Sequence, residues 1–211
     1  MMEKGAIFPL FYLPPVELFS RLLEHNPNLL LEKCENFPKQ TFRNRASIHS
    51  PNGQLDLIIP VVRGSKVHTL IKDVRISYDF NWQRSHWLSI QTSYHSSAYF
   101  EFYEDDFAPF YEKKCTFLFD YTEELFQMLI RLLKLNLSYS YTKDYEKHYT
   151  DMEDYRFSIS PKQKEQYSGK TYFQVFEERN GFIPNLSIVD LLFNQGPQSN
   201  NFLSNGKDQT Y

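Results

Sequence analysis

The pattern of apolar and polar positions changes along the chain, and each change predicts a separate element of structure. Ala6–Phe11 is a short apolar run that ends at Leu13-Pro14-Pro15, as expected for a strand followed by a helix that starts at Pro15. The helix has an apolar stripe made by Val16, Phe19, Leu22 and Leu23. Because Leu29–Lys33 is again a run of strand length, the opening predicts a β-α-β unit with parallel strands.

Two further runs predict an antiparallel hairpin. Thr41–Ile48 and Leu55–Val62 flank Ser50-Pro51-Asn52-Gly53, which is a strong turn signal. The second run is almost continuously apolar, which predicts burial on both of its faces. A further strand is expected around Val67, Thr69 and Ile71.

Three helices are expected in the middle of the chain. Asn81 can cap a helix over residues 82–93, and Phe100–Lys114 has aromatic residues at helical spacing. Asp120 starts the third helix, because Asp120 and Glu123 have the spacing of a capping pair and a regular apolar face follows.

Near the end of the chain, Tyr172–Phe176 predicts a strand and Phe182–Pro197 predicts a short helix. Ser187 can cap that helix, Asp190 can reach back to the cap, and Gly196 can end the helix in a left-handed conformation. A catalytic carboxylate at Asp190 is the alternative, but we prefer the capping role.

These elements predict a single domain. The stretch over residues 138–170 is polar and rich in charge, so it is expected to be a surface segment or a lid. We expect the domain to cover residues 1–197 and the residues 198–211 to form a frayed tail. The predicted fold class is α/β or α+β, with a mixed sheet, an opening β-α-β unit, an antiparallel hairpin and several packing helices.

The composition limits the classes of partner that the protein is expected to bind. The 211 residues carry a net charge of −3 and no run of Lys and Arg, which argues against nucleic acid. Aromatic residues make up 17%, enough to line a sugar or nucleotide cleft, although a Phe- and Tyr-rich core is the simpler explanation. Cys34 and Cys115 have no CxxC spacing, so no disulfide, metal or cofactor is expected. No apolar run approaches the roughly 20 residues of a membrane span, and we expect a soluble cytoplasmic protein.

The predicted strand Thr41–Ile48 places two arginines on one face. Arg43 and Arg45 alternate with other residues, and two neighbouring guanidinium groups form a receptor for phosphate or carboxylate. Asn44 points to the opposite, apolar face, where its amide needs partners. The alternative is a solvated arginine face, with Asn44 bonded to the backbone of a loop.

The predicted helix over residues 82–93 carries a second set of candidates. His86 lies in one row with Trp82, while Trp87 and Tyr94 lie in another. A histidine with an unperturbed pKa of about 6.5 suits general-base catalysis at neutral pH. The alternative is a semi-buried histidine that is satisfied by hydrogen bonds.

Four blocks of the chain resemble the WbqC-like proteins, a bacterial family. They are Pro9–Phe19, with Tyr12-Leu13-Pro14-Pro15; Lys39–Ile48, with Asn44-Arg45 and the turn and Leu-Ile-Ile-Pro-Val strand that follow; Trp82 with His86-Trp87 and Tyr94; and Phe182–Gly196, the most specific block. The chain is similar to a compact form that lacks a central segment after the Asp120 helix. The resemblance implies a sugar-modifying transferase of surface-polysaccharide assembly.

Two functions are compatible with these features. The first is an intracellular transferase for a nucleotide-linked sugar or an acyl or aminoacyl donor. Arg43 and Arg45 would hold a donor phosphate and Asn44 would orient the acceptor. His86 would take the acceptor proton, and Trp87 and Tyr94 would bind substrate. The second is a non-catalytic binding or assembly protein of a cell-envelope pathway, which contacts another protein through residues 138–170. The sequence does not fix the oligomeric state.

Overall fold

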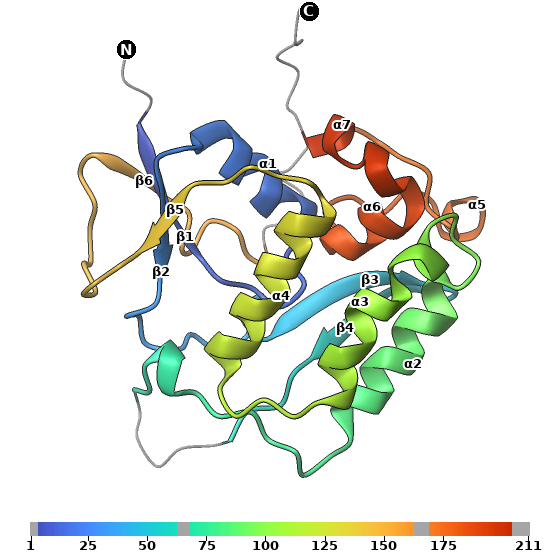
Figure 1. Ribbon diagram of the computed structural model, residues 1–211, viewed down its shortest axis with the longest axis horizontal. Helices are drawn as coiled ribbons and strands as arrows, with labels where there is room; N and C mark the ends of the chain where they lie inside the picture. The colour runs from blue at the N-terminus through green and yellow to red at the C-terminus, as the bar shows by residue number, and fades with distance from the viewer. Residues whose placement is uncertain (1–3, 63–67, 163–168, 204–211) are drawn as a thin grey trace, which may run out of the picture.

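The computed structural model describes residues 4–62, 68–162 and 169–203, and it has two sheets with helices packed around them (Figure 1). The larger sheet has the strand order β5-β2-β1-β6, and every neighbouring pair is parallel. Its strands are β1 (Gly5–Pro9), β2 (Leu29–Glu32), β5 (Tyr139–Tyr141) and β6 (Met152–Asp154). The smaller sheet is an antiparallel hairpin of β3 (Arg45–Ser50) and β4 (Gly53–Ile58). The predicted mixed α/β fold is confirmed.

The opening β-α-β unit forms as predicted. Helix α1 (Val16–His25) connects β1 to β2, and Ala6 pairs with Leu29 in a parallel register. Pro15 stands at the N-cap, one residue before the position that the sequence predicts for it. Its extended backbone, with φ −65° and ψ 156°, turns the chain from the strand into the helix.

The hairpin begins later than predicted, and this changes the placement of the arginines. Strand β3 starts at Arg45, and residues 41–44 form a turn in which the Phe42 carbonyl accepts hydrogen bonds from the backbone N–H groups of Tyr12 and Arg45. Arg43 therefore does not share a strand face with Arg45, and that expectation is wrong. Burial on both faces of the return strand is also wrong, because Gln54, Asp56 and Ile58 of β4 are exposed.

Two other predicted strands are absent from the described residues. Ile71 begins the 3-10 turn η1 (Ile71–Asp73), and Val67 lies outside the described residues. The segment 172–176 makes no ladder, and the side chain of Gln174 pairs instead with the backbone of Ile183. Its Oε1 accepts from Ile183 N and its Nε2 donates to Ile183 O, both at 2.9 Å.

The three middle helices are α2 (Trp82–Tyr94), α3 (Phe100–Glu112) and α4 (Leu118–Leu132). Asn81 caps α2 as predicted, since its Oδ1 accepts from Arg84 N at 3.3 Å. The predicted capping pair of Asp120 and Glu123 is wrong. Helix α4 starts before both residues, and the Leu118 N–H at its first turn donates to the Val74 carbonyl of a neighbouring segment.

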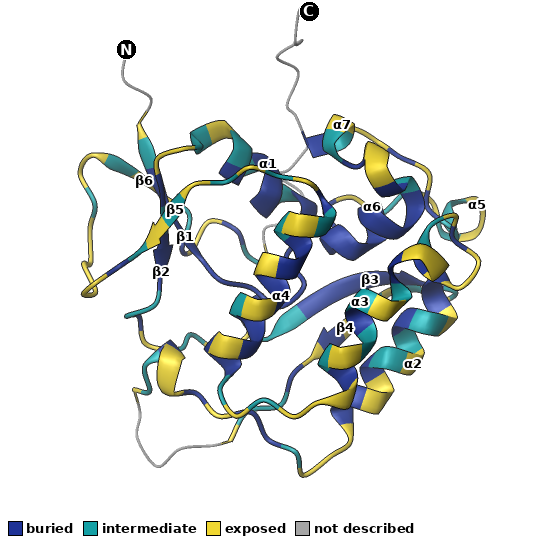
Figure 2. Cartoon of the chain, viewed as in Figure 1, coloured by how far each residue is buried: buried dark blue, intermediate teal, exposed yellow. Residues whose placement is uncertain are grey.

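The last part of the chain contains α5 (Glu177–Asn180), α6 (Ile188–Gln195), η3 (Gly196–Gln198) and α7 (Asn200–Leu203). Ser187 caps α6, because its hydroxyl accepts from Val189 N. Gly196 ends α6 with φ +52°, and a Cβ there would lie 2.5 Å from the ring of Tyr99. Figure 2 shows α6 almost entirely buried. Residues 204–211, in the expected tail, lie outside the described residues.

The polar segment over residues 138–170 is largely at the surface, but it also contributes both edge strands of the parallel sheet, β5 and β6. These strands lie on opposite edges, so residues 142–151 must cross the width of three strand spacings, about 14 Å. The expected lid segment is therefore partly built into the sheet, through two strands of three residues each.

Helices cover one face of the parallel sheet. Phe126 and Phe119 of α4 pack on Tyr139 and Tyr141 of β5, with ring centroids 5.8 and 6.1 Å apart. Helix α1 joins the same layer, because Phe19 stacks on Phe126. Figure 1 shows α1 and α4 on this side of the sheet, whereas the other side carries the connection from β5 to β6.

Candidate functional site

We call the second side of the parallel sheet the helix-free face. In the parallel register, Ser140, Leu30, Ile7 and Asp154 are lateral neighbours, so their side chains project to the same side. The alternate residues, which include Tyr139 and Tyr141, face α4. Parallel sheets are normally covered on both faces. A face without a helical layer is therefore the first place to look for a site.

Charged side chains gather on this face where the strands end, at the carboxyl-terminal edge of the sheet. We call this group the carboxyl-edge cluster, and its members are Glu32, Glu35, Arg43, Asp154 and Arg156. Glu32 ends β2 and Asp154 ends β6, so parallel pairing brings both to one edge. Thr142, just after β5, donates from its hydroxyl to Glu32 at 2.7 Å.

Arg156 is the centre of the cluster and its side chain is fully buried. Its Nε and Nη2 donate to the two oxygens of Asp154 at 2.9 and 2.6 Å. Its Nη1 donates to Glu32 at 3.0 Å and to the Glu146 carbonyl at 2.8 Å. This fork therefore ties β2, β6 and the β5–β6 connection together.

Arg43 makes the second buried pair. Its Nε and Nη2 donate to the two carboxylate oxygens of Glu35 at 2.5 and 2.7 Å, and Nη2 also donates to the carbonyl of Arg156 at 3.0 Å. Arg43 thus joins the turn before β3 to the carboxyl edge of the parallel sheet. Its guanidinium is satisfied by protein groups, with a side-chain exposure of only 2%.

The cluster holds three carboxylates against two guanidinium groups, so its members carry one excess negative charge when all are ionised. Burial raises the pKa of Glu35, an effect that the Arg43 charge partly offsets. Burial acts in the same direction on Asp154, but its hydrogen bonds to Arg156 outweigh it and lower the pKa of that carboxyl group. Asp154 therefore stays ionised, and its side chain keeps 30% exposure.

Aromatic rings surround the buried guanidinium of Arg156. The rings of Tyr145 and Tyr149 have their centroids 5.1 Å from its Cζ, and that of Phe157 lies at 5.9 Å. Tyr145 and Phe157 are exposed, with 44% and 57% of their surface accessible. Their outer faces offer flat apolar surface beside the cluster, suited to stacking on a sugar or base.

His86 belongs to a buried chain of hydrogen bonds between uncharged side chains. Its Nδ1 is 2.9 Å from the Tyr12 hydroxyl, which is 3.0 Å from the Tyr111 hydroxyl. A second bond joins the imidazole to the backbone of Ile58. Burial lowers the pKa of His86 to about 4, so the ring is neutral at neutral pH. Both of its nitrogens are occupied, and 6% of the residue is exposed.

Asn44 and Arg45 lie near His86, at the open end of the hairpin. Asn44 donates to the Ile59 carbonyl at 2.8 Å, and Arg45 is the register partner of Ile58. The guanidinium of Arg45 is 26% exposed and lies 3.7 Å from Asp56, longer than a hydrogen bond. Its Nε has no hydrogen-bond partner among the described residues. Arg45 is therefore the candidate with unused donors.

Trp87 and Tyr94 do not join this group. Trp87 stacks on Tyr111 with ring centroids 5.2 Å apart and an interplanar angle of 20°. Tyr94 lies two turns further along α2 and donates to Asp190 at 2.7 Å. The structure thus gathers Asn44, Arg45 and His86 around Ile58 and Ile59. It directs Arg43 to Glu35 and Tyr94 to Asp190.

Asp190 is more than a helix cap, and the predicted reach back to Ser187 does not occur. Its carboxylate accepts from the Tyr94 and Tyr172 hydroxyls at 2.7 and 2.8 Å and from the Gln174 amide at 2.9 Å. Burial raises its pKa to about 6, although these three donors counteract the shift. Asp190 joins α6 to α2 and to the segment that precedes α5.

Two of the hollows on the surface of the described residues are lined by none of these groups. One, of about 440 Å³, lies on the amino-terminal half of the helix-free face. The other, of about 280 Å³, lies where α3 leads into α4 and includes Cys115 and Tyr121 in its lining. Within residues 4–62, 68–162 and 169–203, no three His, Cys, Asp or Glu side chains gather as a metal site would require.

Sequence reasoning missed the carboxyl-edge cluster. One signal was available, because Glu32 follows three leucines at the end of a buried strand, where a carboxylate needs a buried partner. Nothing local marks Arg156, which lies within a polar stretch. Pairing of β6 with β1 makes it a core residue.

The fold and the cluster define a class: an α/β protein with a parallel sheet and a charged group at its carboxyl edge. The chain matches the model of the WbqC-like protein family over residues 11–167, and it belongs to that family. The resemblance is thereby confirmed, although the block that we took as most specific, Phe182–Gly196, lies beyond the matched range.

One curated relative extends the comparison to nearly the whole chain. It is the "Uncharacterized protein Rv1507c" of Mycobacterium tuberculosis, to which this chain is 25% identical over 228 residues. The match covers 96% of this chain and 98% of the relative. No solved structure matches the chain. Among the described residues, no helix is both long and apolar enough to cross a membrane.

Proposed function

We propose that this protein is a transferase that acts on a nucleotide-linked sugar or an acyl or aminoacyl donor in bacterial surface-polysaccharide assembly, and that its substrates meet at the carboxyl edge of the parallel sheet. One observation carries the proposal. Each buried arginine–carboxylate pair among the described residues belongs to that edge, where α/β proteins bind their ligands.

The free-energy cost of burying the charged groups of the cluster supports a functional interpretation. Buried ion pairs rarely improve stability over apolar packing, since the desolvation of both charges offsets their attraction. Around His86 and Asp190, by contrast, uncharged hydroxyl and amide groups pair with the buried side chains. Neutral hydrogen-bond networks would satisfy buried polar groups at a lower desolvation cost. Stability alone therefore does not explain two buried arginines.

The residues predicted from the sequence enter this proposal unequally. Arg45 keeps the role of contacting the anionic part of the donor, because its side chain is 26% exposed and its nearest carboxylate, Asp56, lies 3.7 Å away. Arg43 and Arg156 act as positioning residues, since carboxylates and carbonyls engage them. Asp154, ionised and partly exposed, accepts a hydrogen bond from the acceptor. Asn44 and His86 support the hairpin end that carries Arg45.

A thermal-shift panel tests the proposal. Sugar nucleotides, acyl-coenzyme A compounds and aminoacyl adenylate analogues are added to the purified protein, and at least one is expected to raise the melting temperature. Arg45→Ala should abolish that shift. Arg84→Ala, which changes an exposed arginine of α2, should preserve it. A wild-type protein that no donor stabilises would overturn the proposal.

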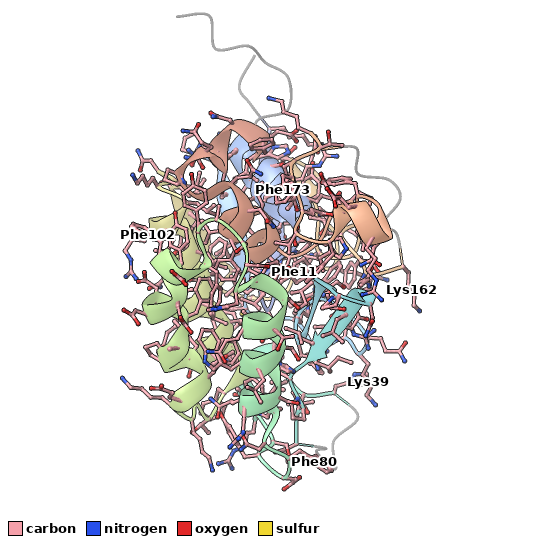
Figure 3. The ribbon with its side chains drawn as sticks, turned by 90° about the vertical axis from the view of Figure 1, so that its right-hand side faces the viewer. Phe11, Lys39, Phe80, Phe102, Lys162 and Phe173 are labelled. Carbon is pink, nitrogen blue, oxygen red and sulfur yellow. The ribbon has the colours of Figure 1, made fainter. Side chains whose placement is uncertain are left out.

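The alternative, a non-catalytic assembly protein, would need a continuous surface for its partner. The exposed aromatic residues Phe80, Phe102 and Phe173 are 77%, 74% and 56% accessible, but Figure 3 shows them at separate parts of the molecule. Phe11, by contrast, lies in the centre of the same view. These three residues form no continuous surface. The exposed rings of Tyr145 and Phe157, which both lie beside Arg156, adjoin the carboxyl-edge cluster and favour a ligand site there.

A further inference from the structure

The hollow of about 440 Å³ on the helix-free face has a chemistry that differs from that of the carboxyl-edge cluster. Its lining includes Asn28 and Leu30 of the β2 region, Ser138 and Ser140 of the β5 region, and Met152 of β6. None of its lining residues is Asp, Glu, Lys, Arg or His. Its volume falls within the range of about 300–1,000 Å³ that is usual for ligand sites.

The strand register explains why these side chains converge. Ser138 and Ser140 are alternate residues of one strand region, and Asn28 and Leu30 are alternate residues of its neighbour. All four therefore project from the helix-free face. Gly5 lies between Asn28 and Met152 at the bottom of the hollow. A side chain there would narrow it, because a Cβ would lie 3.1 Å from the Asn28 carbonyl oxygen and 3.2 Å from Met152 Cε.

The rim of the hollow is held in place by Asn26. Its side-chain amide donates to the Asn136 carbonyl at 2.9 Å, and its Oδ1 accepts from Ser138 N at 2.9 Å. These bonds fix the entry to β5 beside the entry to β2. The serine hydroxyls are therefore carried on a backbone that is already positioned for a ligand.

We infer that this hollow binds a neutral, polyhydroxylated sugar unit. The hydroxyl groups of Ser138 and Ser140 both donate and accept hydrogen bonds, which matches sugar hydroxyls that do the same. The apolar atoms of Leu30 and Met152 offer contact for the C–H face of a sugar ring. A phosphorylated or carboxylated ligand would find no cation in the lining, so a neutral ligand fits best.

The position of the hollow assigns this sugar to the acceptor. The row of Ser138 and the row of Thr142 are four residues apart along the strands, about 13 Å. A glycan seated in the hollow could extend along the strands toward the carboxyl-edge cluster. This assignment as acceptor rests on the proposed function, whereas the binding of a sugar at this place can be measured on its own.

The experiment is saturation-transfer NMR on the full chain with glucose, galactose, mannose, N-acetylglucosamine and rhamnose as probes. At least one probe should receive magnetisation from the wild type. Ser140→Trp fills the hollow from an exposed position of a β-strand, where tryptophan is tolerated, and should reduce the binding about tenfold. Ser96→Trp, at an exposed position after α2, is the matched control and should bind as the wild type does.

Ser138→Trp is a second filling variant, for the case in which Ser140→Trp folds poorly. Wild-type binding by both folded filling variants, or failure of all five probes to bind the wild type, would overturn the inference. The donor panel is then repeated on Ser140→Trp, where a retained thermal shift is expected. A sugar signal without any donor shift would leave the sugar site standing and reject the transferase.

Discussion

The interior contains two kinds of polar region, which differ in how they stabilise their buried polar groups. The carboxyl-edge cluster pairs full charges, with Arg156 between Asp154 and Glu32. The regions around His86 and Asp190 use neutral hydroxyl and amide partners. In the first, pairing keeps Asp154 ionised; in the second, burial drives both titratable groups toward their neutral forms.

This difference separates the roles of the two kinds of region. A charged cluster depends on both partners, so the loss of one partner leaves a buried charge. A neutral network depends on protonation state, so it responds to pH. The cluster should therefore be sensitive to substitution, and the neutral networks should be sensitive to acid or base.

The largest effect is expected from Arg156→Met. This change leaves Glu32 and Asp154 without their shared guanidinium, and it should lower the free energy of unfolding by about 3–5 kcal/mol. Urea unfolding at neutral pH measures the loss. Arg84→Met on the exposed side of α2 should change stability by less than about 0.5 kcal/mol. Equal losses in the two variants would remove the contrast between cluster and surface.

The next effect concerns His86. Its pKa falls from 6.5 to about 4 on folding, so the unfolded chain binds more protons between these values. The stability that this provides is complete above pH 6.5 and is lost as the pH falls toward 4. Relative to His86→Gln, the wild type should lose about 3 kcal/mol across that window, measured by chemical unfolding at several pH values. A constant difference between the two proteins would contradict the neutral, buried imidazole.

Asp190 should show the opposite sign. Its pKa rises from 3.8 to about 6 on folding, so the folded protein binds more protons between these values. The resulting stability is present below pH 3.8 and is lost as the pH rises through 6. Compared with Asp190→Asn, the wild type should lose about 3 kcal/mol over this range. If the difference instead grows with pH, the carboxyl group is ionised in the fold and its three donors prevail over burial.

The smallest effect is expected at the cap of α6. Ser187→Ala removes the hydroxyl that accepts from Val189 N and should cost about 1 kcal/mol. Thermal unfolding compares it with Ser96→Ala, an exposed serine after α2 that should be neutral. No loss at Ser187 would mean that tertiary contacts alone hold the start of α6.

Local patterns of the sequence determined most of the helices and the opening unit. The cap at Asn81, the cap at Ser187 and the stop at Gly196 are interactions within a few residues, so their chemistry is visible in the letters. The prediction of a parallel β1–β2 pair follows from a short helix between two apolar runs. Family membership was also readable from local blocks, three of which overlap the matched residues 11–167.

Tertiary structure alone decided which polar residues meet. Glu32 and Arg156 are 124 positions apart and join only because β6 pairs with β1. Arg43 and Arg45 are two positions apart, yet a turn directs Arg43 to Glu35 and leaves Arg45 with a free donor. Asp190 has the spacing of a capping residue, but its carboxylate accepts hydrogen bonds from three donors that are distant in the sequence. Local energies fix elements, whereas the partners of a buried polar group depend on the packing of the whole chain.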